Sequence, residues 1–155
     1  MKRIMQSTLA FAIAMTFSVV TVKAQELEEI IVTATKKEES LQDISVSVTV
    51  VDGELIEKAA INSLQDLGRY VPNFSVSENA ISTIATMRGI SIGANQSFEQ
   101  SVGLFVDGVH LPKGRQFRTG LFDVERVEVL RGPQGTLFGK NTLTGAINVI
   151  SAKPV

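Results

Sequence analysis

Beyond its N-terminal region, this chain carries apolar residues only in short runs of strand length. In ISVSVTVV, which spans Ile44–Val51, apolar residues alternate with Ser and Thr. Such a period of two predicts a strand with one buried face. Further short strands are predicted at Phe74–Ser77, Ser82–Met87, Val102–Val106, Val124–Leu130 and Ala146–Ser151. The dipeptide Asp107-Gly108, between LFV and VHL, predicts a two-residue hairpin turn.

Two short helices are predicted between the first and second strands. Asp52 can cap a helix over Glu54–Ala60, in which Leu55, Ile56, Ala59 and Ala60 share one face. Ser63 to Asp66 forms a capping-box pattern for a second helix. That helix should end near Tyr70, because Pro72 restricts the residue before it. Gly-rich, polar loops are expected at Ser91–Ser101 and Pro112–Gly120.

The amino-acid composition limits the classes of protein to which this chain can belong. The 155 residues allow one domain, and 44% hydrophobic with 20% charged residues is an ordinary globular balance. The net charge of −1 provides no basic surface for nucleic acid. With no Cys and a single His, the chain has no disulfide, thiolate site or multi-His metal site. No cofactor is expected.

The N-terminus has the features of a secretory signal peptide. A basic start precedes an apolar core at Leu9–Val20, and Val22-Lys23-Ala24 provides a cleavage site before Gln25. The alternative is an uncleaved membrane anchor, but the core is shorter than the roughly 20 residues that a spanning helix needs. Cleavage would leave 131 residues with a formal charge of −4. We therefore divide the chain into a signal peptide (1–24), a flexible tail (25–42) and one folded domain (43–155).

Motifs for catalysis are incomplete. The segment from Gly139 to Thr142 hints at a phosphate loop, but the first Gly and the magnesium-binding hydroxyl are missing. His110 has no nucleophile close in sequence and is interpreted as a surface or loop residue. Glu125 and Glu128 are three apart in a predicted strand and face opposite ways, so they are interpreted as solvated charges. The sequence therefore predicts no enzyme.

Several segments, in their order along the chain, resemble the plug domain of TonB-dependent outer-membrane receptors. The resemblance rests on DVERVEVLRGPQGTLFGKNTLTGAINVISAKP from Asp123, TIATMRGI from Thr83, SVGLFVDGV from Ser101, and the stretch Ile44–Asn73. It implies an α+β fold: a small mixed sheet with short helices on one face and long Gly-rich loops. The strands that start at Ile44, Val102, Val124 and Ala146 should form this sheet.

This chain departs from the family at one turn: where the family commonly has Gly-Gly-Ala, it has Thr144-Gly145-Ala146. A positive φ at Thr144 would strain that turn by about 1–2 kcal/mol.

EIIVTA resembles the TonB box of the same family, which implies binding to the C-terminal domain of TonB. Its residues are Glu29, Ile30, Ile31, Val32, Thr33 and Ala34. Consecutive β-branched residues favour an extended backbone, and the flanking charges should keep it unpaired until a partner adds a strand. The alternative is a leader whose apolar patch packs on the plug.

The resemblance also implies that Arg88 and Arg131 match plug arginines that pair with glutamates of the surrounding barrel. Without it, both would be interpreted as ordinary exposed arginines. A barrel of about 22 strands at about 10 residues each exceeds this chain, so we expect an incomplete or truncated receptor of the outer membrane. Its cargo would be a scarce nutrient such as a ferric siderophore. The alternative is a free periplasmic binding module, which a stop codon directly after Val155 would favour.

Overall fold

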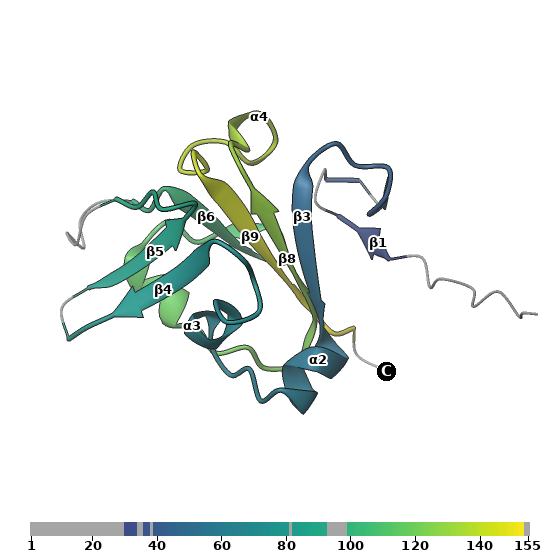
Figure 1. Ribbon diagram of the computed structural model, residues 1–155, viewed down its shortest axis with the longest axis horizontal. Coiled ribbons are helices and arrows are strands. Elements are labelled where there is room, and N and C mark those ends of the chain that lie inside the picture. Colours follow the sequence, from purple (N-terminus) through teal and green to yellow (C-terminus); the bar gives the residue numbers. More distant parts are fainter. Residues whose placement is uncertain (1–29, 34–35, 38, 81, 93–98, 154–155) are drawn as a thin grey trace, which may run out of the picture.

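The computed structural model describes residues 30–33, 36–37, 39–80, 82–92 and 99–153 (Figure 1). The expected signal peptide and its cleavage site lie outside these residues, as do Glu29, Ala34 and most of the loop Ser91–Ser101. Within the described ranges, no helix is both long enough and apolar enough to cross a membrane.

A five-stranded mixed sheet forms the centre of the fold (Figure 1). Its strand order is β3-β8-β9-β6-β7; β6 and β9 run parallel, and the other neighbours are antiparallel. The predicted mixed sheet is therefore confirmed, with strands that begin within three residues of the expected positions. The strands are β3 (Ser47–Asp52), β6 (Val102–Val106), β7 (Val109–His110), β8 (Val124–Arg131) and β9 (Gly145–Ser151).

The main core lies on one face of this sheet. Odd-numbered apolar residues of β8 and β9, such as Val127 and Ile147, are fully buried there. They pack beneath two helices and a separate two-stranded antiparallel sheet. These covering elements are α2 (Gly53–Lys58), α3 (Leu64–Leu67), β4 (Phe74–Glu78) and β5 (Thr83–Met87). The prediction that helices cover one face is confirmed.

Local signals placed the helix starts correctly. The Asp52 carboxylate accepts a hydrogen bond from the Leu55 N–H at 2.7 Å, and the Ser63 hydroxyl accepts one from the Asp66 N–H at 3.2 Å. The expected shared face of the first helix is only partly right, because Ile56 is buried whereas Leu55 is exposed. The helix expected to reach Tyr70 ends at Leu67.

The connecting segments differ more from expectation. Asp107 and Gly108 adopt positive φ angles of 48° and 81°, as a tight hairpin between β6 and β7 requires. The expected loop at Pro112–Gly120 instead contains a 3₁₀ helix, η1 (Gly114–Arg118), whose Phe117 is fully buried in the core. A short helix, α4 (Gly135–Phe138), precedes β9. Thr144 is not among the residues with positive φ, so the strain considered for this turn does not arise.

The second face of the sheet is covered by the N-terminal segment. Strand β1 (Ile31–Val32) pairs antiparallel with β2 (Glu39–Ser40). Val32 is buried against Phe105 and Leu130, and Val48 and Val50 of β3 pack beside them. The expected unpaired segment is therefore paired and packed in this structure, through side chains that alternate onto this face.

Candidate functional site

Thr33, directly after β1, is held by a buried carboxylate of the central sheet. Its backbone N–H donates to Glu128 Oε1 at 2.8 Å, and its hydroxyl donates to the same carboxylate at 3.2 and 3.3 Å. Glu128 lies in β8, 95 residues along the chain, and is 0% exposed. This contact joins the segment that resembles the TonB box to the centre of the plug sheet.

Two further side chains complete the surroundings of Glu128. Arg126 donates through Nε to Oε1 at 2.9 Å, and Asn148 of β9 donates through Nδ2 to Oε2 at 3.4 Å. Arg126 also pairs with Glu125. A buried carboxylate is costly unless it is paired and hydrogen-bonded, and these contacts meet that requirement. The interpretation of Glu128 as a solvated charge is therefore wrong, whereas Glu125 is exposed as expected.

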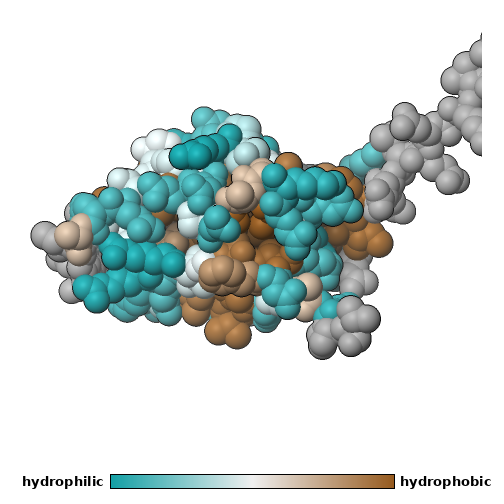
Figure 2. Space-filling model, turned by 90° about the horizontal axis from the view of Figure 1, so that it is seen from below, coloured by the Kyte–Doolittle hydropathy of each residue, from teal (hydrophilic) through white to brown (hydrophobic). Residues whose placement is uncertain are grey.

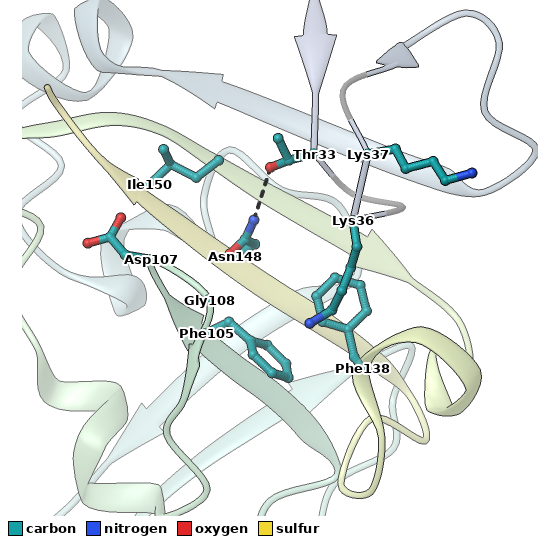
Figure 3. Close-up of a pocket in the computed structure, with 9 residues that line it drawn as sticks. All are labelled: Thr33, Lys36, Lys37, Phe105, Asp107, Gly108, Phe138, Asn148 and Ile150. Atoms are coloured by element: carbon teal, nitrogen blue, oxygen red, sulfur yellow. Dashed lines mark hydrogen bonds between the residues drawn. The ribbon is translucent and has the colours of Figure 1, made fainter.

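A cavity of about 410 Å³ opens beside this contact, between the N-terminal segment and the sheet (Figure 3). Lys36 Nζ lies 5.1 Å from the Phe138 ring centroid and 5.8 Å from that of Phe105, within cation–π range. His110 stacks on Phe105 with ring centroids 4.9 Å apart, so it is partly buried and not a plain surface residue. The cavity is lined by Thr33, Lys36, Lys37, Phe105, Asp107, Gly108, Phe138, Asn148 and Ile150.

The structure places Arg88 and Arg131 next to one turn. Arg88 follows β5 with a φ of 53°, and its Nη1 lies 3.4 Å from where a Cβ on Gly132 would stand. Arg131 ends β8, immediately before Gly132, and its buried Nε has no hydrogen-bond partner among the described residues. No carboxylate of the described ranges forms an ion pair with either guanidinium. Two cations at one turn that have no counter-charge among the described residues form a site that fits an acidic partner.

Large apolar side chains also remain uncovered, with Phe122 79% and Leu143 71% exposed. Figure 2 shows that apolar residues gather in the centre of one face, among hydrophilic residues. An exposed apolar area on one face of a domain is typical of an interaction site. In the part of the chain that the structure describes, no group of acidic, His or Cys side chains is placed to hold a metal ion.

Comparisons with known proteins agree with this architecture. The profile of the TonB-dependent Receptor Plug Domain matches residues 40–146. The chain is 35% identical to the pesticin receptor of Yersinia pestis over 84% of its own length and 20% of the receptor. It is 34% identical to the vitamin B12 transporter BtuB of Vibrio vulnificus, over 94% of its own length and 25% of the transporter. The crystal structure of the ferric yersiniabactin uptake receptor FyuA from Yersinia pestis superposes with a TM-score of 0.62 at 33% identity, covering 70% of this chain and 17% of that one.

These matches define the class as a receptor plug built on a small mixed sheet. The chain belongs to the TonB-dependent receptor plug domain family, because the family profile covers more than half of it. It spans a fifth to a quarter of the length of these curated relatives.

The family resemblance singled out the two arginines and the N-terminal segment as candidate sites, whereas the sequence analysis missed the burial of Glu128. One local signal was available: Glu128 lies among Val127, Val129 and Leu130, in a run of strand residues that are all buried. A charged side chain inside an apolar strand lies either at the edge of the sheet or in the interior, where it needs ionic or hydrogen-bonding partners. Its partner Thr33 is too distant in sequence to be found by pattern.

Proposed function

We propose that this chain is the plug of a TonB-dependent outer-membrane receptor that takes up a scarce nutrient. The observation that carries the proposal is the family match over residues 40–146, which includes β3, β6, β7 and β8 of the central sheet in full and the first two residues of β9. The relatives are named as a pesticin receptor, a vitamin B12 transporter and a ferric yersiniabactin uptake receptor. A ferric siderophore is the class of cargo that we propose, and the proposed role is transport, not catalysis.

The proposed place of the domain is inside a barrel of the outer membrane, with the N-terminal segment toward the periplasm. Arg88 and Arg131 would pair there with acidic side chains of the barrel wall. Their lack of ion pairs within the described residues supports this role, because a guanidinium stays charged at any working pH and binds carboxylates bidentately. The exposed apolar side chains also support this place, because an enclosing barrel wall would cover them.

The proposed coupling segment is Glu29–Ala34, which would add a strand to the C-terminal domain of TonB. The formation of β1 at Ile31–Val32 supports it, because these two residues already have an extended, strand-paired backbone. Strand addition draws its affinity mainly from main-chain hydrogen bonds, and side-chain changes are comparatively mild.

A titration of the TonB domain with a synthetic peptide of residues 25–42 tests this coupling. Ile31→Pro should abolish binding, because proline removes a backbone donor and fixes φ. Ile31→Ala is the matched control and should weaken binding far less, since it keeps the main chain intact. Equal binding of the wild-type and Ile31→Pro peptides, or no binding at millimolar concentration, would refute the coupling role.

A further inference from the structure

Strand β1 has two edges, and only one of them faces β2. The Leu41 N–H donates to the Ile30 carbonyl oxygen at 2.9 Å, and Val32 lies opposite Glu39 in the register. Backbone groups of successive strand residues point alternately to the two edges. The N–H groups of Ile31 and Thr33 therefore lie on the edge that faces away from β2.

This outer edge is the one that a further strand would need. Its Thr33 N–H is already engaged, because Glu128 Oε1 accepts from it at 2.8 Å. The carboxylate thus stands where the carbonyl oxygen of an added strand would stand. The Thr33 hydroxyl donates to the same carboxylate and gives Thr33 a second point of attachment to Glu128.

We propose that Glu128 is a positioning residue that closes the outer edge of the TonB-box-like strand, so that a partner strand must displace its carboxylate. This inference rests on the proposed function, since it takes the TonB domain as the source of that strand. Displacement does not leave a bare buried charge: Arg126 and Asn148 still donate to Glu128 after Thr33 has left. The release can therefore be reversible without unfolding the sheet.

The test compares two variants of the full chain with the same change in charge. Glu128→Gln replaces the charged acceptor with a neutral one at the Thr33 contact. Glu125→Gln, its matched control, removes a carboxylate that also pairs with Arg126, whereas the Thr33 N–H and hydroxyl donate to Glu128. Hydrogen bonds to charged groups exceed neutral ones by roughly the free energy of a tenfold change in an equilibrium constant. Glu128→Gln should therefore speed hydrogen exchange at the Thr33 amide about tenfold.

The same variants are titrated with the TonB domain, beside the peptide of residues 25–42, which lacks Glu128. We expect the peptide to bind more tightly than the wild-type chain, and Glu128→Gln to close most of that difference, with Glu125→Gln unchanged. If Glu128→Gln does not fold, Thr33→Val provides the exchange measurement, because it keeps the backbone N–H contact, removes the hydroxyl bonds to Glu128 and from Asn148, and should still speed exchange in residues 30–33.

The outcomes separate this inference from the proposed function. If the peptide binds TonB but Glu128→Gln matches the wild-type chain in affinity and exchange, the role of Glu128 is overturned and the coupling role stands. If the peptide does not bind, the coupling role fails, and the exchange rates alone decide whether Glu128 holds the strand.

Discussion

Gly145 is the position at which one added methyl group should most disturb this plug. It opens β9 and lies opposite Arg131 in the register with β8. A Cβ built on it would stand 2.3 Å from the Leu130 carbonyl oxygen and 2.1 Å from Met87 Sδ. The methionine can move, but the carbonyl belongs to the neighbouring strand and moves only with the sheet.

The size of the effect follows from this geometry. Overpacking a close-packed core by a methyl group costs about 1–3 kcal/mol, and a backbone contact favours the upper part of that range. We therefore expect Gly145→Ala to lower the free energy of unfolding by about 2–3 kcal/mol. With a urea m-value of about 1–3 kcal/mol/M for a small domain, the unfolding midpoint should fall by about 1 M or more.

Urea unfolding of the chain, followed by far-ultraviolet circular dichroism, measures this shift. Gly135→Ala is the matched control, because a Cβ on Gly135 meets nothing within 4 Å and its φ is not positive. At such a site Ala should be neutral or stabilise by up to about 1 kcal/mol. A Gly145→Ala variant as stable as the Gly135→Ala control would refute the reasoning that this strand contact admits no side chain.

Two further predictions concern local contacts. Asp52→Ala removes the acceptor for the Leu55 N–H and should lower the free energy of unfolding by about 1 kcal/mol in the same urea assay; an unchanged midpoint would show that the cap contributes nothing. The Asn141 amide, which donates to the Glu99 carboxylate at 2.5 Å, lowers the pKa of Glu99, with the Lys140 charge adding to the effect. The stability from this contact is therefore present above the ordinary carboxyl pKa and is lost as the pH falls through the lowered one. An NMR pH titration should place the Glu99 midpoint below the ordinary Glu range and show it rising in Asn141→Ala; an equal midpoint in both would contradict this cause.

What the sequence determined by itself is the set of local elements. The alternation in β3, the caps at Asp52 and Ser63, and the Asp107-Gly108 turn rest on hydrogen bonds or periodicities within a few residues. Neighbouring residues contain all the information that the caps and the turn need, and the structure confirms them. The strand prediction is only partly right, because β3 begins at Ser47, Val48 and Val50 are half-buried, and the buried Val51 belongs to the core on the other face. The family resemblance added how these elements assemble, as a small mixed sheet with short helices on one face.

The tertiary structure alone decided which distant residues meet. Glu128 is buried because Thr33, 95 residues away, and Asn148 donate to it, and no local pattern encodes that pairing. The same holds for Phe117, whose 3₁₀ helix forms where polar residues predicted a loop. Arg88 likewise reaches the turn at Gly132 only through the packing of β5 beside the main sheet. Burial and long-range hydrogen bonds depend on which surfaces the folded chain brings together, so they override local preferences at these positions.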